Sequence, residues 1–202
     1  MPGPPEGIVR GDDGLARCWW GAADPLYRRY HDREWGRPVK DDRRLFEKIC
    51  LEGFQSGLSW LTILRKRDNF RKAFAGFEIE AVAGFNARRI ETLMQDAGIV
   101  RNRAKILATI NNARRCLDLA REDRSLAAYA WSFEPRHSGT GLTFGPEAMA
   151  MSTDLKKRGW AFVGPTTVHS FMQAVGMIND HVVGCDARQE VERVRASFVR
   201  PR

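Results

Sequence analysis

Apolar side chains recur at the three- and four-residue spacing of an α-helix along most of this 202-residue chain. One stripe contains Leu45, Ile49 and Glu52, and another contains Ile106 and Ile110. Strict alternation of apolar and polar residues, the pattern of a half-buried strand, is nearly absent. The sequence therefore predicts an all-α fold of several short helices, many of them separated by glycines.

The chain is predicted to hold one folded domain between two less regular ends. Residues 1–16 contain three prolines and four glycines, which favours a flexible tail. Residues 17–186 carry the helical pattern and are predicted to form a single helical domain. Residues 132–146 are rich in glycine and predict a long surface loop, and 187–202 predict a tail or a short amphipathic helix.

Composition narrows the class of partner. The formal net charge is +8, which favours an acidic partner such as nucleic acid or an anionic membrane surface. The alternative is a basic surface that faces only solvent, which has the same net charge. No apolar run approaches the ~20 residues of a membrane helix, and the first residues lack the apolar core of a signal peptide. We therefore expect a cytoplasmic protein without a membrane partner.

Cysteine and histidine residues predict a metal site. In a cytoplasmic protein the four cysteines are expected to be thiols or metal ligands. Cys18 and His31 are 13 positions apart, and His181 and Cys185 are spaced to share one face of a helix. Two cysteines with two histidines form a closed tetrahedral zinc set, which is structural. Alternatively, His169 is a ligand in place of one of these, or all are separate buried residues.

Glu52 continues an apolar helix stripe, where a lone carboxylate is costly unless it is paired or serves chemistry. Gly53 and Gly57 are predicted to break the helix beside it and to allow close approach of a ligand. Aromatic residues lie near it in the sequence: Trp19, Trp20, Tyr27, Tyr30, Trp35 and Trp60. They predict either a tryptophan-rich core with Glu52 in a salt bridge, or a pocket that stacks a flat, cationic ring.

Residues 87–119 predict two helices joined by a hairpin. Gly98 suits a tight turn that requires positive φ, and Asn102 suits the N-cap of the second helix. The helix start offers backbone amides to an anion, and the basic residues around it are Arg101, Arg103 and Lys105. This arrangement is suited to DNA phosphates, although an ordinary helical hairpin with solvated arginines has the same pattern.

Several long segments closely resemble the 3-methyladenine DNA glycosylase I family, in unbroken order over about residues 17–186. The segments are RCWWGAADPLYRRYHDREWG (17–36), LFEKICLEGFQSGLSWLTILRKRDNFRKAF (45–74), QDAGIVRNRAKI (95–106), WSF (131–133), LKKRGWAFVGPTT (155–167) and SFMQAVGMINDHVVGC (170–185). The resemblance implies a helix-hairpin-helix DNA glycosylase fold, with a hairpin at 96–105 that contacts DNA.

The resemblance also implies the site residues. A single structural zinc ion would join the N- and C-terminal segments through Cys18, His31, His181 and Cys185. The pocket for the damaged base falls on Trp20, Tyr27, Tyr30, Glu52 and Trp60. Because the family lacks the usual catalytic aspartate after the hairpin, Glu52 is the acid expected to take part in catalysis. The DNA contacts fall on Gly98, Arg101, Arg103 and Lys105.

Three positions depart from the family pattern. His169 stands where an aromatic residue such as tyrosine is expected, and Phe54 and Ser56 stand where the family often has glutamine and alanine. These departures bear on local packing and on contacts with the DNA duplex, and leave the predicted chemistry unchanged.

The implied reaction is base excision from alkylated double-stranded DNA. Hydrolysis of the N-glycosidic bond would release free 3-methyladenine and leave an abasic site, without strand cleavage, and the protein is expected to act as a monomer. The first alternative is a DNA-binding module that keeps the hairpin and the metal but has lost activity. A zinc hydrolase is the second, and it requires an open coordination position.

Overall fold

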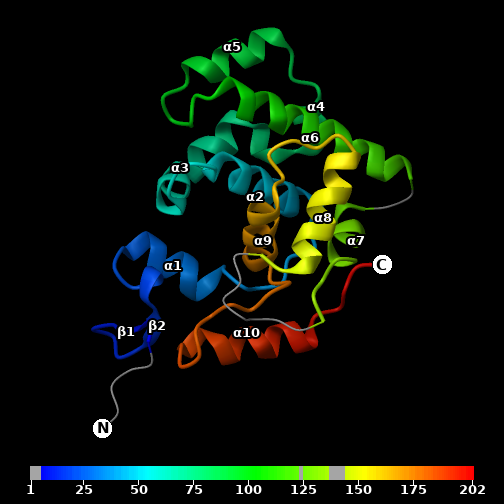
Figure 1. Ribbon diagram of the computed structural model, residues 1–202. Coiled ribbons are helices and arrows are strands. Elements are labelled where there is room, and N and C mark those ends of the chain that lie inside the picture. Colours follow the sequence, from blue (N-terminus) through cyan, green and yellow to red (C-terminus); the bar gives the residue numbers. More distant parts are fainter. Residues whose placement is uncertain (1–5, 123–124, 137–143) are drawn as a thin grey trace. The chain divides into compact units, whose positions relative to one another are not determined.

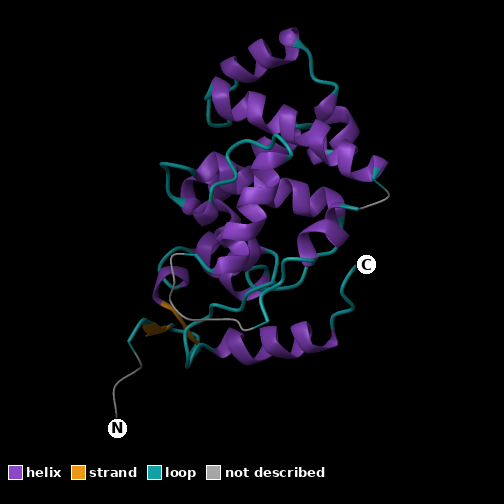
Figure 2. Cartoon of the chain, turned by 45° about the vertical axis from the view of Figure 1, so that its right-hand side comes forward, coloured by secondary structure: helices purple, strands orange, loops and turns teal. Residues whose placement is uncertain are grey.

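The computed structural model describes residues 6–122, 125–136 and 144–202. Helices dominate this part of the chain, as predicted, and a short two-stranded antiparallel sheet accompanies them (Figure 2). Residues 137–143 of the predicted surface loop lie outside the described ranges. No helix within those ranges combines the length and apolar character needed to cross a membrane.

The chain forms two compact units. Unit 1 comprises Met1–Val39, Glu134–Leu142 and Met172–Val199, and unit 2 comprises Lys40–Phe133, Thr143–Phe171 and Arg200–Arg202. Unit 1 therefore joins segments from the beginning and the end of the sequence, whereas unit 2 holds most of the middle.

Unit 1 begins with a β-hairpin where the sequence predicted a flexible tail. Ile8 pairs with Cys18 across the hairpin, and Ile8 and Ala16 are buried with Cys18 and Cys185. This small apolar cluster explains why the segment is ordered. The elements of unit 1 are β1 (Ile8–Arg10), β2 (Ala16–Cys18), η1 (Trp19–Gly21), α1 (Pro25–Arg33) and α10 (Asp186–Ser197) (Figure 1). At 187–202, the helical alternative is thus the one observed.

Unit 2 contains a helical core. Its elements are α2 (Asp42–Gln55), α3 (Trp60–Ala73), η2 (Ala75–Phe77), α4 (Ile79–Ala83), α5 (Ala87–Gln95), α6 (Arg103–Arg121), α7 (Leu126–Trp131), α8 (Pro146–Lys157) and most of α9 (Pro165–Ala174). Phe54 packs against Phe70 and Phe74, with ring centroids 4.6 and 5.7 Å apart. The side chain of Phe54, one of the departures from the family pattern, therefore belongs to the aromatic core.

The predicted hairpin lies between α5 and α6. Asn102 caps α6 as predicted, because its side-chain oxygen accepts a hydrogen bond from the Lys105 amide at 3.1 Å. Two side chains of α3 hold the turn: Lys66 donates to the Ala97 carbonyl at 2.9 Å, and Asn69 donates to the Gly98 carbonyl at 3.4 Å. The turn is therefore fixed from outside as well as by its own cap.

Candidate functional site

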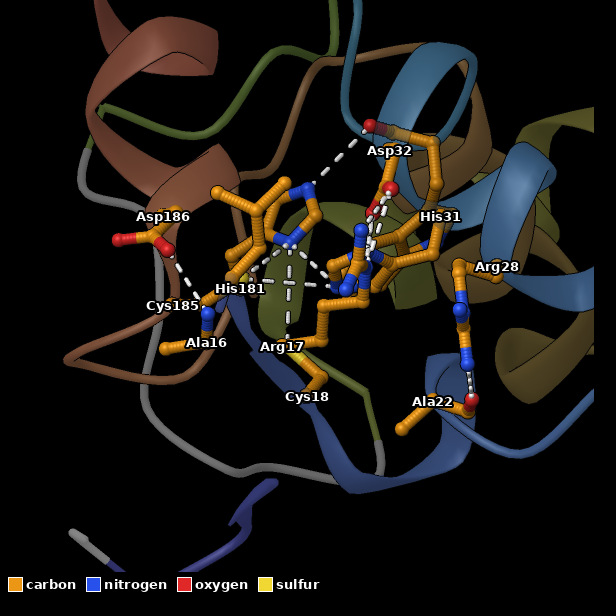
Figure 3. A network of polar contacts seen from close by, with 12 residues as sticks. Ala16, Arg17, Cys18, Ala22, Arg28, His31, Asp32, His181, Cys185 and Asp186 are labelled. Carbon is orange, nitrogen blue, oxygen red and sulfur yellow. Dashed lines mark hydrogen bonds and ion pairs between the residues drawn. The ribbon is translucent and has the colours of Figure 1, made fainter. Parts of the chain in front are cut away.

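The four predicted metal ligands lie together in unit 1. The candidate ligand atoms of Cys18, His31, His181 and Cys185 are all within 4.8 Å of one another, and all four residues are buried (Figure 3). Nε2 of His31 is 3.2 Å from Nδ1 of His181, and Sγ of Cys185 is 3.5 Å from each of these nitrogen atoms. Two sulfur and two nitrogen donors at this spacing can hold a metal ion.

Different elements supply these ligands. Cys18 ends β2 and His31 lies in α1. The sequence prediction that His181 and Cys185 share a helix face is wrong, because the chain forms a turn between them, with Gly184 at a φ of 96°, and Cys185 is the N-cap of α10. The turn achieves the same result as a helix, since it returns the chain so that both side chains reach one point.

A glycine brings the C-terminal ligands to the N-terminal ones. Gly176 has a φ of 79°, and a Cβ atom there would lie 2.4 Å from the backbone of Arg37 and Pro38. Close contact between these two backbone segments, both in unit 1, requires glycine. Backbone hydrogen bonds from Gly36 to Gln173 and from Val39 to Val175 continue the contact.

The remaining cysteines and histidines are placed elsewhere. His169, the alternative ligand, lies in α9 within unit 2 and does not belong to the cluster. Cys50 and Cys116 are buried in unit 2, and burial raises the pKa of the Cys50 thiol. His137 lies outside the described residues.

Hydrogen bonds act on the two sulfur atoms in opposite directions. The hydrogen bond between the two thiols raises the pKa of Cys18 and lowers the pKa of Cys185, and the bonds of Cys185 with His181 and His31 lower its pKa further. The thiolate is the form that binds a metal ion. The Val182 amide also donates to Sγ of Cys18 at 3.2 Å, a contact that stabilises negative charge on that sulfur.

Asp32 and Arg17 form an outer layer around His31 that sequence reasoning missed. Nδ1 of His31 lies 2.7 Å from a carboxylate oxygen of Asp32, which leaves Nε2 to face the other ligands. Arg17 in turn donates to both oxygens of Asp32 at 3.0 Å (Figure 3). A carboxylate placed in this way fixes the histidine tautomer and increases its basicity. The acidic residue immediately after His31 is the signal in the sequence.

We expect Asp32→Asn to weaken metal binding by about 10- to 100-fold, because the amide no longer holds the tautomer or the charge. Competition with a chromophoric chelator measures the affinity. Asp118→Asn, at an exposed ion pair in unit 2, is the matched control and should leave the affinity unchanged. Equal affinities for Asp32→Asn and the unaltered protein would contradict this role of Asp32.

Glu52 lies in the last turn of α2 and is 5% exposed. Burial raises its pKa to about 8, while the nearby charge of Lys48 acts in the opposite direction. Glu52 lines a cavity of about 240 Å³ in unit 2 together with polar residues of α9, which sequence reasoning did not single out: Thr166, Thr167 and Ser170. A buried acid with a raised pKa at a cavity is typical of a functional site.

The segment after Glu52 differs from the prediction in one respect. α2 continues through Gly53 and ends at Gln55, so Gly53 does not break the helix. The chain turns at Gly57, which has a φ of 76°, and Ser59 then caps α3, of which Trp60 is the first residue. A glycine such as Gly53 can adopt helical backbone angles and does not by itself end a helix. The chain leaves the helical path only near Gly57, where a positive φ is required.

The other predicted pocket aromatics belong to unit 1. The Trp20 ring lies 4.9 Å from the Tyr27 ring and 5.0 Å from the His31 ring, measured between centroids. Tyr30 is buried in α1. Trp20 therefore packs beside the candidate metal cluster. The predicted pocket aromatics of unit 1 and the candidate metal ligands are thus neighbours in the same part of the fold.

The predicted DNA contacts differ in exposure. Arg101 is exposed, and Arg103 is exposed but pairs with Glu91 at 2.7 Å. Lys105 is buried, and its ammonium group donates to two backbone carbonyls. Lys105 was predicted to contact phosphates together with the arginines, but helix phase turns its side chain inward, away from the solvent to which theirs are exposed.

Glycine at position 98 is favoured for a different reason from the one predicted. It does not have positive φ. A Cβ atom would instead lie 2.9 Å from Oδ1 of Asp96 and 3.1 Å from Asn69. The turn therefore depends on close approach of these two side chains, of which Asp96 also accepts a hydrogen bond from the Gly98 amide at 2.7 Å.

Comparison with known proteins identifies the class. Residues 19–189 match the methyladenine glycosylase family. DNA-3-methyladenine glycosylase 1 of Escherichia coli K12 is 48% identical over 179 residues, which cover 85% of this chain and 96% of that protein. The Haemophilus influenzae DNA-3-methyladenine glycosylase is 39% identical, with coverage of 85% and 97%.

Solved structures agree with these relatives. A crystal structure of 3-methyladenine DNA glycosylase I is 46% identical and superposes with a TM-score of 0.81, covering 84% of this chain and 98% of that one. The Staphylococcus aureus enzyme, studied for its recognition of 3-methyladenine, is 36% identical with a TM-score of 0.81, and the coverage is 85% and 96%. The fold is thus that of a helical DNA glycosylase. The chain belongs to the methyladenine glycosylase family.

Proposed function

We infer that this protein is a base-excision repair glycosylase that removes 3-methyladenine from alkylated DNA. Water adds to the sugar carbon and loses one proton to solvent as the bond from that carbon to the base nitrogen breaks. The electron pair of this bond stays with the base, which leaves as a neutral molecule, and an abasic site remains. The observation that carries this inference is the match over 85% of the chain to enzymes named for this activity. The buried Glu52 at its cavity supplies a carboxyl group suited to recognition of a cationic base.

Five residues are proposed to bind the extruded base: Trp20, Tyr27, Tyr30, Glu52 and Trp60. Methylation at N3 gives adenine a positive charge and makes it a good leaving group, so strong acid catalysis is unnecessary. Aromatic faces attract a cation, and the Glu52 carboxylate accepts hydrogen bonds from the edge of the base. Neutral adenine lacks the charge, and this difference provides selectivity. A base that pairs poorly is also easier to extrude from the duplex.

The raised pKa of Glu52 bears on this role. With a pKa of about 8, the carboxyl group is largely protonated at neutral pH before substrate binds. A cationic base favours the ionised form, so binding is coupled to release of a proton. Affinity for the cationic lesion should therefore rise with pH up to about 8.

Zinc is the metal proposed for the cluster in unit 1. Two cysteines and two histidines suit tetrahedral zinc, and four protein ligands leave no position for water. The ion would stabilise unit 1 and would take no part in the hydrolysis, which argues against the zinc hydrolase alternative. Such a cluster requires reduced thiols, in line with the proposed cytoplasmic location. Monomeric action stays a prediction.

The hairpin is proposed to contact DNA phosphates through the α6 N-terminus, Arg101 and Arg103. We expect Gly98→Val to weaken duplex binding more than Arg101→Met, because a bulky side chain clashes with Asp96 and Asn69 and distorts the turn. Arg101→Met should reduce the slope of log affinity against log salt by about one unit. Fluorescence anisotropy with an abasic-site duplex at several salt concentrations measures both effects.

Binding of free 3-methyladenine is the control for the hairpin variants, since it requires the pocket and no phosphate. It should survive both substitutions. A folded Gly98→Val protein that binds the abasic duplex normally would show that the hairpin does not contact DNA.

Chromatography of bases released from methylated DNA tests the proposed function as a whole. Release of 3-methyladenine, with the DNA strand left intact until alkali is added, is the expected result. Duplex binding without release would instead identify the DNA-binding module that the sequence left as an alternative.

A further inference from the structure

A buried lysine links the hairpin to the turn that carries Glu52. Lys105 is 8% exposed, and burial lowers its pKa. Its Nζ atom donates to the Phe54 carbonyl at 2.9 Å and to the Ser56 carbonyl at 2.5 Å. Within the described part of the chain, no carboxylate pairs with Lys105. A buried cation is costly unless its donors are satisfied, so these two bonds define its environment.

The two carbonyls belong to the C-terminal end of α2, where the last carbonyls of a helix lack intrahelical partners. The carbonyls of Gly53 and Gln55 have partners nearby, since they accept hydrogen bonds from the backbone amides of Ser56 and Leu58, respectively. The Phe54 and Ser56 carbonyls receive the lysine ammonium instead. A positive charge at this position also complements the negative end of the helix dipole.

The two carbonyls that Lys105 contacts are close in sequence to residues that line the cavity. Glu52 precedes Phe54 by two residues in the last turn of α2, and Glu52 and Ser56 both line the cavity. The backbone amide of Lys105 donates a hydrogen bond to the side chain of Asn102, the N-cap of α6. One residue therefore joins the proposed DNA-binding hairpin to the end of the helix that holds the pocket acid.

We propose that Lys105 is a positioning residue, which fixes the C-terminal turn of α2, and with it Glu52, relative to the hairpin. A base extruded from DNA held at the hairpin must meet the carboxylate at a defined place. A displacement of about 1 Å at a reacting centre can reduce a rate by about 100-fold. Lys105 acts on main-chain carbonyls, so the link does not depend on the side chains at positions 54 and 56, two of the departures from the family pattern.

Lys105→Met tests the proposal, because methionine keeps the apolar stem and removes the ammonium. Single-turnover excision from a duplex with one 3-methyladenine should fall by about 10- to 100-fold. Affinity for an abasic duplex should stay within about twofold and its salt slope should not change. Binding of free 3-methyladenine should weaken as well, since the pocket acid is displaced. Lys156→Met, the same change at an exposed lysine of α8, is the matched control and should behave as the unaltered protein.

A phosphate contact gives the opposite pattern. If Lys105→Met weakens abasic-duplex binding, reduces the salt slope by about one unit and leaves the single-turnover rate intact, then Lys105 is a DNA contact and the proposal is wrong. An unchanged rate with unchanged DNA affinity overturns it too. If the methionine variant does not fold, Lys105→Gln, which keeps one N–H donor, carries the same measurements. Lys105→Arg, which keeps charge and donors, should restore more of the rate than Lys105→Gln does.

The proposal rests on the pocket role proposed for Glu52, and a double-mutant cycle separates their failures. If both act through Glu52, Lys105→Met should have little further effect on the rate in a Glu52→Gln background. If the effects of the two substitutions on the rate add fully, the positioning role of Lys105 is wrong and the role of Glu52 stands. A Glu52→Gln protein that excises normally would overturn the pocket role itself.

Discussion

Glu52→Gln should leave the protein folded and reduce excision of 3-methyladenine by about 10- to 100-fold. The variant keeps the shape of the side chain and loses the charge that recognises a cationic base. A hydrogen bond to a charged group contributes about 1.5–3 kcal/mol, and each 1.4 kcal/mol is about tenfold in rate. Single-turnover release from a duplex with one lesion measures the effect. Glu47→Gln, in the same helix but ion-paired with Arg71, is the matched control.

The same variant should be more stable than the unaltered protein in alkaline solution. The pKa of Glu52 is raised in the folded state, to about 8 from an ordinary 4.5. Its contribution to stability is therefore fully present below pH 4.5 and is lost as pH rises through about 8, since only the unfolded chain ionises freely. Glutamine does not ionise, so the melting temperature of Glu52→Gln should match the unaltered protein at pH 4 and exceed it at pH 9.

These two measurements test the assignment independently. A Glu52→Gln protein with lower stability at pH 9 would contradict the buried, neutral carboxyl group. One with the original excision rate would contradict its role in base recognition. Lost activity together with gained stability is the expected combination, because groups placed for function often reduce stability.

Cys18→Ser and His181→Ala should release the metal and lower the melting temperature by about 10 °C or more. Loss of a metal site is among the few changes that cost above 4 kcal/mol, and for a chain of this length 1 kcal/mol corresponds to roughly 2–4 °C. Elemental analysis of the purified proteins and calorimetry measure the two effects. Before substitution we expect one zinc ion per chain.

Cys116→Ala is the matched control for the metal ligands. Cys116 is buried in unit 2, outside the cluster, so its loss should cost stability through packing alone and should leave the zinc content unchanged. Freshly purified protein without zinc would contradict the assignment of the metal. Full excision at low temperature by Cys18→Ser would agree with it, since the proposed ion has no part in the reaction.

The sequence supported those predictions that depend on spacing along one helix. The helical class, the apolar stripe that includes Glu52 and the Asn102 cap were all predicted, because each depends on neighbours within a few turns. The four candidate ligands could also be named, but residue types and spacing left His169 as an alternative, and the resemblance to the family supplied the set of four. Their arrangement could not be predicted, because the turn between His181 and Cys185 depends on packing of distant segments.

The direction of a side chain was harder to predict than its position. Lys105 and Arg103 lie two residues apart, so they point to different sides of α6, yet only tertiary contacts decide which side is buried. Gly98 shows the same limit, because Asn69, one of the two side chains that a Cβ atom would crowd, comes from α3. The strands near the N-terminus were missed because Ile8 and Ala16 pack on residues from the other end of the chain.

The composition of unit 1 from both ends of the sequence constrains when it can form during synthesis. Cys185 leaves the ribosome 154 residues after His31, a delay of roughly 8–30 s at 5–20 residues per second. Through that interval Cys18 and His31 have no partners for a complete cluster, while helices α2–α7 are already available to pack. Capture of the proposed metal ion would therefore come late in synthesis, and a chain truncated before residue 185 would lack one of the four candidate ligands.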